Sequence, residues 1–404
     1  MWPVESGTSA SGDRPHYAVV FEWIIWVRGS RLVVTTAISV RVEMRDEQGM
    51  ARAIELAQCA RLHAPPNPWV GCVIASSEGV FEGATSVPGG PHAEAAALQA
   101  AGERARGATM YVTLEPCAHT GRTPPCTSAI IDAGISRVVV GAEDPDLRVS
   151  GRGIAVLGEA GVNVVVGVLR EAVEEQLAPY LKHRRTNRPW VVLKLAATMD
   201  GRLAAPDGTS KWITGPEARS DVARLRLMSD AVLVGAGTIR TDDPSLTVRL
   251  GAQSERLRAG EHEQPDEPQR EPLRVVLGRV PEQAKVRPAI EMEGDLGAVL
   301  DRLGSMGVLQ LMVEGGARVA HAFHASGLAD RYVLYLAPAL FGGDDAVPMF
   351  RGEGAISISD LWRGRLISVE RLGDDLRVDL APVLTEPGAQ WSYEREMSEP
   401  CLLD

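Results

Sequence analysis

The sequence predicts two α/β domains of different kinds joined by a short linker. Between residues 46 and 185, helical patterns alternate with short buried strands, which is typical of a sheet covered by helices. A basic stretch that contains a proline, "KHRRTNRPW" at 182–190, then precedes a new strand and is taken as the linker. The chain length of 404 residues agrees with two domains, since one domain usually takes about 100–200 residues. We find no internal repeat, so the second half is not a copy of the first.

Local patterns predict the elements of the first domain. Apolar residues at helical spacing indicate helices, and short β-branched runs bounded by turn formers indicate buried strands. We therefore expect helices over 46–63, 92–105, 127–135 and 151–161. We expect strands over 70–76, 108–116, 137–144 and 162–168. The prolines of "APPNPWV" break the first helix before the first strand.

The second domain shows the same mixture of elements. It begins with the strand pattern "PWVVLKLAATMDGRLA", and residues 219–249 then predict a helix, a strand and a loop. Further buried strands are expected within 273–278, 308–316 and 329–343, and "VEGG" at the end of the second of these is expected to open a helix. Residues 251–272 are charged and poor in apolar residues, so we expect an exposed loop there.

Charge and cysteine content narrow the class of protein. The net charge of −11 and the pI of about 5.4 argue against general nucleic-acid binding, which usually needs a basic face. Five cysteines, an odd number in a long chain, do not indicate a disulfide framework, so we expect a reducing cytoplasm. The apolar run "FEWIIWVRGSRLVV" is interrupted by Arg28 and Arg31 and falls short of the ~20 apolar residues of a membrane span. We therefore expect neither nucleic acid nor membrane as a partner.

The two ends of the chain lie outside the domain patterns. Residues 1–43 are interpreted as a poorly ordered extension, or as a wrongly assigned start with Met44 as the first residue. Residues 384–404 are interpreted as a C-terminal tail. The expected domains are therefore 44–186 and 187–383.

Four residues of the first domain form a zinc pattern. His92 and Glu94 lie in "PHAEAAAL" at the start of a predicted helix, and Cys117 and Cys126 lie in "EPCAHTGRTPPC". The order H-x-E, then P-C-x8-C, resembles the zinc deaminase signature H-x-E, then P-C-x-x-C, with a wider cysteine spacing. Zinc takes nitrogen and sulfur ligands and keeps one position for water in catalytic sites. We therefore predict that His92, Cys117 and Cys126 bind Zn²⁺.

Glu94 is the predicted catalytic residue. Zinc would lower the pKa of a water, and Glu94 would take its proton and deliver it to the ring nitrogen and the leaving amine. A structural zinc is the main alternative, but such a site usually takes four protein ligands. His119 could be proposed as the fourth ligand, but we prefer it as a substrate contact. A non-catalytic zinc-binding interaction module would not need the carboxylate. The remaining cysteines are interpreted as packing or idle residues: Cys59, Cys72 and Cys401.

Longer motifs in both halves resemble one family. In the first half these are "PNPWVGCVI", "PHAEAAAL", "YVTLEPCAHTGRTPPC" and "DPDLRVSGRG". In the second they are "KLAATMDGRLA", "GTSKWITG", "DAVLVGAGTIRTDDPSLTVR" and "VEGGARVAHAF". Together, over about residues 46–383, they resemble the bifunctional pyrimidine deaminase/reductase of riboflavin biosynthesis. The resemblance implies an N-terminal cytidine-deaminase-like three-layer α/β/α domain and a C-terminal dihydrofolate-reductase-like α/β domain.

The resemblance also implies two consecutive reactions. The first removes an exocyclic amine from 2,5-diamino-6-(5-phosphoribosylamino)pyrimidin-4(3H)-one. The second uses NADPH to reduce the ribosyl chain of 5-amino-6-(5-phosphoribosylamino)uracil to ribityl. The implied cofactors are therefore Zn²⁺ and NADPH, and the expected assembly is a homo-oligomer.

Motif matches assign further contacts. The cofactor would contact Ala196, Trp212, Thr238, Asp242, Gly316, Ala317, Arg318, Val319, Ala320, His321 and Ala322. The reductase substrate would contact Ser210, Arg226, Leu246, Arg249 and Glu314. The deaminase substrate would contact Asn67, His119, Arg122 and Asp144. A guanidinium suits a phosphate because it offers a rigid fork of donors, although an arginine on a helix is more often a solvated surface charge.

Two features limit these matches. Asp146 stands where the family often has Asn, and "AIEMEGD" at 289–295 is short and acidic where the family has another strand. A lost strand would leave an edge in the sheet or weaken the cofactor site. The alternatives are therefore a deaminase with an impaired reductase domain and a deaminase that acts on another base or nucleoside.

Overall fold

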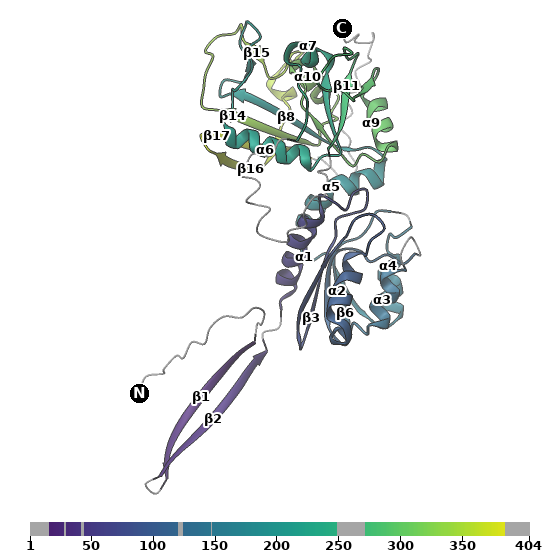
Figure 1. Cartoon of the computed structure of the whole chain (residues 1–404), viewed down its shortest axis with the longest axis vertical. Coiled ribbons are helices and arrows are strands. Elements are labelled where there is room, and N and C mark those ends of the chain that lie inside the picture. Colours follow the sequence, from purple (N-terminus) through teal and green to yellow (C-terminus); the bar gives the residue numbers. More distant parts are fainter. Residues whose placement is uncertain are drawn as a thin grey trace. The chain divides into compact units, whose positions relative to one another are not determined.

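The chain forms two compact units. The computed structural model describes residues 16–27, 30–41, 44–119, 124–146, 148–248 and 271–383 (Figure 1). The boundary between the units lies between Gln176 and Leu177, and Pro65–Pro68 group with the second unit. Before the first domain motif, strands β1 (His16–Val27) and β2 (Ser30–Arg41) pair antiparallel as a two-stranded sheet. Among the described residues, none of the helices is long and apolar enough to cross a membrane.

The first unit is built on a five-stranded sheet in the order β4-β3-β5-β6-β7. Its strands are β3 (Gly71–Ser76), β4 (Gly79–Ala84), β5 (Thr109–Leu114), β6 (Arg137–Ala142) and β7 (Asn163–Val166). β5, β6 and β7 run parallel, whereas β3 is antiparallel to both of its neighbours. The helices are α1 (Asp46–Ala60), α2 (Ala93–Ala101), α3 (Cys126–Asp132) and α4 (Arg152–Glu159), with the short 3-10 helix η1 (Gly102–Ala105) after α2. Helix α5 (Arg170–Thr186) begins in this unit and continues across the boundary after Gln176.

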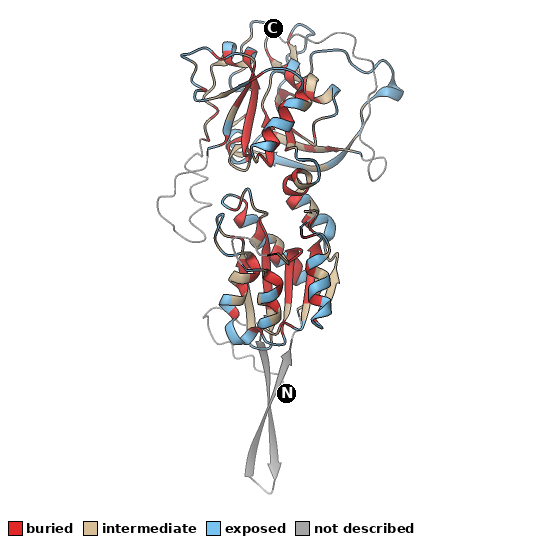
Figure 2. Cartoon of the chain, turned by 90° about the vertical axis from the view of Figure 1, so that its right-hand side faces the viewer, coloured by how far each residue is buried: buried red, intermediate tan, exposed pale blue. Residues whose placement is uncertain are grey.

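Two glycines show that α1 and α2 cover opposite faces of this sheet. A Cβ on Gly71 would lie 1.9 Å from the Ala53 carbonyl oxygen of α1. A Cβ on Gly83 would lie 2.3 Å from the Ala93 carbonyl oxygen of α2. Gly83 pairs with Cys72, the neighbour of Gly71, and consecutive strand residues face opposite sides of a sheet. The unit is therefore a three-layer α/β/α structure whose strands are mostly buried (Figures 1 and 2).

The second unit is built on an eight-stranded sheet in the order β12-β11-β10-β13-β8-β14-β17-β16. The strands from β12 to β14 run parallel, and the last two are added antiparallel. The eight strands are β8 (Trp190–Thr198), β10 (Ala231–Gly235), β11 (Leu273–Leu277), β12 (Ile290–Met292), β13 (Gln310–Val313), β14 (Arg331–Ala337), β16 (Gly364–Leu372) and β17 (Asp375–Pro382). A separate small sheet pairs β9 (Arg202–Ala204) with β15 (Val347–Pro348).

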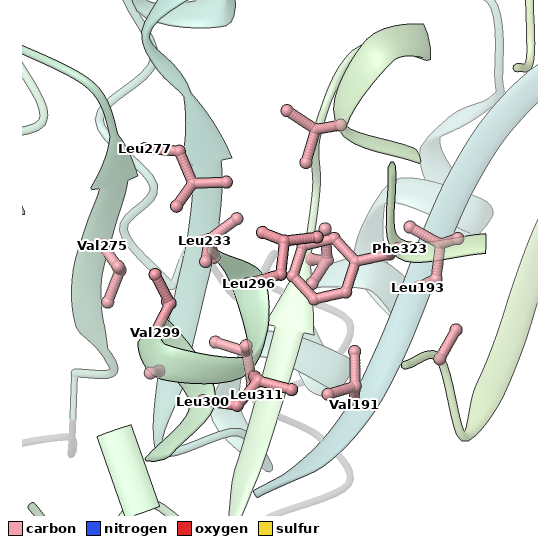
Figure 3. Packing of buried hydrophobic residues seen from close by; sticks show 14 of the residues in the cluster. Val191, Leu193, Leu233, Val275, Leu277, Leu296, Val299, Leu300, Leu311 and Phe323 are labelled. Atoms are coloured by element: carbon pink, nitrogen blue, oxygen red, sulfur yellow. The ribbon is translucent and has the colours of Figure 1, made fainter. Parts of the chain in front are cut away.

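Alternation along β8 explains how helices cover both faces of the large sheet. Val191 and Leu193 pack with α9 (Leu296–Ser305) and α10 (Ala317–Ala325), as the cluster in Figure 3 shows. Val192 points the other way and packs with α6 (Pro216–Leu227) and α7 (Ala236–Asp242). Parallel strands buried on both faces read as nearly continuous apolar runs, which is why "WVVL" was recognisable in the sequence. The remaining element is the 3-10 helix η2 (Ile358–Asp360).

Three details differ from the sequence-based expectations. The expected linker at 182–190 begins inside α5, which continues to Thr186. The strand thought to be missing near "AIEMEGD" is present as β12, whose three residues pair in parallel with β11. A neighbouring strand can hold so short an edge strand through its backbone even when the local pattern is weak. The strands β4, β9, β15, β16 and β17 were not recognised, and the tail at 384–404 lies outside the described residues.

Candidate metal and cofactor sites

His92, Cys117 and Cys126 converge from three elements of the first unit. His92 is the N-cap residue of α2, Cys117 follows β5, and Cys126 is the first residue of α3. The His92 Nδ1 atom lies 3.3 Å from Cys126 Sγ and 3.7 Å from Cys117 Sγ. All three donor atoms lie within 4.8 Å of one another. The structure therefore gathers the residues that the sequence predicted as metal ligands.

The geometry of this cluster fits a zinc ion. Tetrahedral zinc with usual bond lengths places a nitrogen and a sulfur ligand ~3.6 Å apart. The two nitrogen–sulfur distances of 3.3 and 3.7 Å bracket this value. The backbone N–H of Cys126 also points at Cys117 Sγ, at 3.4 Å, as expected for a donor beside a thiolate. In the part of the chain that the structure describes, the cluster has three members, so a fourth coordination position is open to water.

The electrostatics of the cluster favour an anionic sulfur. A hydrogen bond from Cys126 and another from His92 lower the pKa of Cys117 to about 4. The contact with Cys117 raises the pKa of Cys126. Zinc takes cysteine as thiolate, so metal binding releases any proton that the two thiols still carry. The contact with Cys117 likewise raises the pKa of His92.

Glu94 lies in the first turn of α2, next to the cluster. Its side chain is buried, and burial raises the pKa of the carboxyl group. Glu94 and Cys126 each shift the pKa of the other, so the carboxyl group lies beside the metal ligands. Cys72 of β3 is also buried, and both its burial and the Glu94 charge raise its pKa. Burial therefore favours the neutral thiol of Cys72 and the protonated form of the Glu94 carboxyl group.

The predicted contacts for the deaminase substrate come from separate loops. Asn67 lies between α1 and β3 and is partly exposed. His119 is half-buried, and its Nδ1 atom has no hydrogen-bond partner among the described residues. Asp144 is buried just beyond the end of β6. Arg122 lies outside the described residues.

The predicted cofactor contacts of the second unit gather at one edge of its sheet. β10, β13 and β8 are neighbouring parallel strands. Ala196 lies near the end of β8, Thr238 and Asp242 lie in α7 after β10, and 316–322 begin α10 after β13. The carboxyl ends of parallel strands are where nucleotides bind in open α/β sheets. A Cβ on Gly316 would lie 3.6 Å from the Thr238 hydroxyl oxygen, so these two segments are adjacent.

The start of α10 suits an anionic group. Gly316 is the N-cap residue, and it has no side chain of its own to cap the helix. Uncapped N–H groups and the helix dipole favour a phosphate at such an end. In the following turn, Arg318 is exposed, Ala317, Val319 and Ala320 are buried, and His321 donates from Nε2 to the Glu353 carbonyl oxygen at 2.8 Å. The residues present therefore fit NADPH, with backbone groups near Gly316 and the arginine available to its phosphates.

The predicted contacts for the reductase substrate include an ion cluster around Glu314, whose side chain is 8% exposed. The Arg226 guanidinium donates to both carboxylate oxygens of Glu314, at 2.5 and 2.8 Å. Lys194 Nζ lies 3.7 Å from the same carboxylate. Burial opposes ionisation of Glu314, but Arg226 and Lys194 outweigh it and lower the pKa of the carboxyl group. Burial lowers the pKa of Lys194, and Glu314 offsets part of that effect. The sequence suggested separate contacts, whereas the structure joins these residues.

The remaining predicted residues come from two loops, one between β9 and α6 and one after α7. Ser210 Oγ donates to Asp242 Oδ1 at 3.5 Å, and Trp212 is exposed with a left-handed φ of 72°. The Arg219 guanidinium covers the Trp212 ring at 4.3 Å. Leu246 is buried and also has a left-handed backbone, with φ of 53°. Arg249 lies outside the described residues.

Comparison with known proteins decides the family. Residues 43–142 match the cytidine and deoxycytidylate deaminase zinc-binding region, and residues 189–378 match the RibD C-terminal domain. The chain is 38% identical to the riboflavin biosynthesis protein RibD of Escherichia coli K12, over 83% of this chain and 99% of the relative. It is 37% identical to RibD of Haemophilus influenzae, over 82% and 96%. The chain belongs to the RibD family.

Solved structures agree with this assignment. RibD of Acinetobacter baumannii has a TM-score of 0.75 and 37% identity, covering 84% of this chain and 99% of that protein. The Thermotoga maritima structure described as a diaminohydroxyphosphoribosylaminopyrimidine deaminase/5-amino-6-(5-phosphoribosylamino)uracil reductase has a TM-score of 0.71 and 33% identity, covering 84% and 99%. The fold classes expected for the two RibD domains, deaminase-like and dihydrofolate-reductase-like, are confirmed.

Family membership also confirms the predicted kind of enzyme. This chain has a zinc-binding deaminase half and an NADPH-dependent reductase half, and it serves riboflavin biosynthesis. No comparison favours the alternative of a deaminase with an impaired reductase domain.

Sequence analysis did miss one buried acid of the deaminase half, Glu115, which directly precedes the "PC" of the metal motif. That position was its only signal in the sequence.

Proposed function

We propose that this chain catalyses both steps named for its Thermotoga relative, with the active residues predicted from the sequence. The first step would replace an exocyclic amine of diaminohydroxyphosphoribosylaminopyrimidine by oxygen from water and release ammonia. The second would reduce the sugar of 5-amino-6-(5-phosphoribosylamino)uracil. One observation carries the proposal above all: a His-Cys-Cys cluster of zinc geometry beside a buried, non-ligand glutamate.

In the deaminase half, each residue has a separate task. Zinc on His92, Cys117 and Cys126 supplies the Lewis acidity that makes a water acidic near neutral pH. Glu94 accepts the proton of the water and passes it to the ring and the leaving amine, for which its raised pKa is suited. Asp144 would hold the polar edge of the pyrimidine. His119 is half-buried, its Nδ1 atom has no hydrogen-bond partner among the described residues, and it would also face the substrate.

In the reductase half, the protein positions two molecules against each other. NADPH supplies the hydride. Backbone groups at Gly316 and the exposed Arg318 would hold its phosphates, and Thr238 would lie beside them. The Arg226–Glu314 pair would present polar atoms to the phosphorylated sugar from the adjoining strand end. We assign these roles because the residues follow or lie near the carboxyl ends of neighbouring parallel strands, where nucleotides bind in open α/β sheets.

We infer two further properties from the same structure. Four described cysteines are free thiols, and two of them must stay reduced to bind metal, which supports a cytoplasmic location.

We also infer a homo-oligomer formed through β16, the last strand of the large sheet among the described residues. Leu366 and Val369 of β16 are 57% and 53% exposed, and an apolar edge strand is prone to pair with another copy. Light scattering of Leu366→Lys beside the unchanged chain tests this, and equal masses would contradict it.

A two-stage assay tests the proposed activity. The zinc-loaded chain receives the diaminopyrimidine substrate without NADPH, and ammonia is measured; NADPH is then added and its absorbance followed. We expect ammonia first and NADPH oxidation only afterwards. Ammonia without NADPH oxidation would refute the reductase assignment. No ammonia from this substrate, with release from a cytidine or another base, would refute the substrate assignment while keeping the deaminase chemistry.

A further inference from the structure

Glu115 is a buried carboxylate with an unusual set of partners. Its side chain is 4% exposed, and it lies in the first unit between the end of β5 and the metal ligand Cys117. Oε2 accepts the backbone N–H groups of Asp144, at 3.3 Å, and Gly151, at 3.0 Å. Oε1 accepts those of Gly153, at 2.9 Å, and Ile154, at 3.3 Å. Both carboxylate oxygens are therefore used, and each accepts two donors.

The four donors belong to one stretch of chain, the 144–154 segment, defined here as residues 144–146 and 148–154. Three of the N–H groups come from the start of α4, where the N-cap residue, Gly151, has no side chain that could cap the helix. The first N–H groups of a helix lack internal partners, and a carboxylate there also complements the helix dipole. Glu115 thus does for α4, from 36 residues away, what a local cap does elsewhere.

Close backbone packing reinforces this contact. A Cβ on Gly153 would lie 2.0 Å from the Pro116 carbonyl oxygen and 3.2 Å from Glu115 Oε1. The segment therefore lies directly against the two residues that precede Cys117. Any larger side chain at Gly153 would push the segment away from the metal-ligand loop, because a backbone oxygen cannot yield as a flexible side chain can.

The remaining donor belongs to a residue proposed to bind substrate. Asp144 follows β6, which runs parallel to β5, so Asp144 and Cys117 leave the sheet at the same edge. The Asp144 carboxylate is itself oriented by its turn, since Oδ1 accepts the Asp146 N–H at 2.9 Å. The Asp144 residue is therefore held in two ways, by this turn through its side chain and by Glu115 through its backbone N–H.

We propose that Glu115 is a positioning residue for the deaminase reaction, which fastens the 144–154 segment to the metal-ligand loop and so holds Asp144 for the substrate. The proposal rests on the proposed role of Asp144. Glu115 touches neither the metal ligands' donor atoms nor the substrate in this account. A carboxylate is required because a neutral amide offers one acceptor oxygen and would turn an N–H group toward two backbone donors.

The near-isosteric Glu115→Gln variant tests the proposal in the full, zinc-loaded chain. We expect the KM for the diaminopyrimidine substrate to rise about tenfold with kcat changed less than about threefold, because a contact used for binding is loosened. Hydrogen–deuterium exchange in the 144–154 segment should become faster, while zinc content and reductase activity stay unchanged. Glu159→Gln, at the exposed end of the same helix, is the matched control and should change none of these values.

Each of three results would overturn the proposal. Unchanged exchange in the 144–154 segment would show that Glu115 does not hold it. Faster exchange with an unchanged KM would show that the segment does not position the substrate. Lost zinc with a lower kcat and an unchanged KM would assign Glu115 to the metal loop alone.

A second variant covers the case in which Glu115→Gln does not fold. Gly153→Ala leaves the carboxylate intact and displaces the segment from Pro116 instead. It should produce the same pairing of raised KM and faster exchange, and wild-type values for both would overturn the proposal. Failure of this proposal can be told apart from failure of the proposed function. If the unsubstituted chain releases no ammonia, the substrate assignment is refuted. Hydrogen–deuterium exchange in the 144–154 segment still shows whether Glu115 holds that segment.

Discussion

Arg226 and Glu314 form a two-bond ion pair across the reductase unit, although 88 residues separate them in the sequence. Arg226 lies in the last turn of α6, and Glu314 directly follows β13. Lys194, from β8, lies 3.7 Å from the same carboxylate, so one buried anion is shared by two cations. The arrangement places charge at the edge of the sheet where the cofactor and sugar are proposed to meet.

Removing the anion should be costly. Glu314→Gln removes the carboxylate shared by the partly buried cations Arg226 and Lys194, and breaking a buried pair usually costs ~3–5 kcal/mol. We expect a free energy of unfolding lower by about 3 kcal/mol and loss of NADPH oxidation, measured by chemical denaturation and by the second assay stage. Ammonia release should persist, because the deaminase cluster lies in the other unit. Glu370→Gln, on exposed β16, is the control, and equal stability of the two variants would contradict this account.

The proton-transfer role of Glu94 predicts a selective loss. Glu94→Gln keeps the size of the side chain but removes the group that exchanges the proton, which should lower deaminase kcat by about 100-fold or more. Zinc content should stay near that of the unchanged chain, since Glu94 is not a member of the ligand cluster. The exposed Glu103→Gln is the matched control on the same stretch. Full activity of Glu94→Gln would exclude the proposed catalytic role, and loss of metal would make Glu94 a ligand.

An ion pair at the start of α1 predicts pH-dependent stability. Arg137 donates to both oxygens of Asp46, each at 2.7 Å, and these bonds lower the pKa of Asp46 below its ordinary value of 3.8. A depressed carboxyl pKa contributes stability that is present above pH 3.8 and lost as pH falls through the lower, folded-state pKa. Because the pair is partly exposed to solvent, Asp46→Asn should cost only about 0.5–1 kcal/mol at neutral pH.

Denaturation at several pH values measures this effect. The difference in the free energy of unfolding between Asp46→Asn and the unchanged chain should shrink as the pH falls below 3.8. Asp132→Asn, on the exposed side of α3, serves as the control for removing a carboxylate. A difference that persists undiminished in acid would show that the contact acts through shape and not through charge.

The close packing of α1 on the sheet predicts a sharp steric limit at Gly71. In Gly71→Ala the new Cβ would lie 1.9 Å from the Ala53 carbonyl oxygen, so the helix must move. Overpacking of this kind costs roughly 1–3 kcal/mol, and we expect the upper part of that range because the neighbour is backbone. Gly158→Ala is the contrast, since a Cβ there meets no atom within 4 Å and alanine favours the helix α4. The midpoint temperature of thermal unfolding should therefore fall for Gly71→Ala and stay the same or rise for Gly158→Ala.

Sequence patterns anticipated the elements that local spacing controls. The helical spacing of 46–63 predicted α1, and the apolar runs "VGCVI" and "RVVVG" predicted β3 and β6. The ligands His92, Cys117 and Cys126 were recognisable because their order and flanking residues form a motif. Such signals lie within a few turns of chain, and intrinsic propensity and side-chain periodicity act over the same range.

The tertiary structure alone decided the features that depend on distant partners. β12 exists because β11 offers it a backbone ladder, although three residues with an acidic centre are a weak strand by themselves. Arg226 and Glu314 became one ion pair only when α6 and β13 came together. Glu115 found its four donors 29 to 39 residues further along the chain. Hydrogen bonds and ion pairs of this kind depend on spatial proximity, which periodicity does not encode, so a sequence shows which groups are present and the fold determines which of them meet.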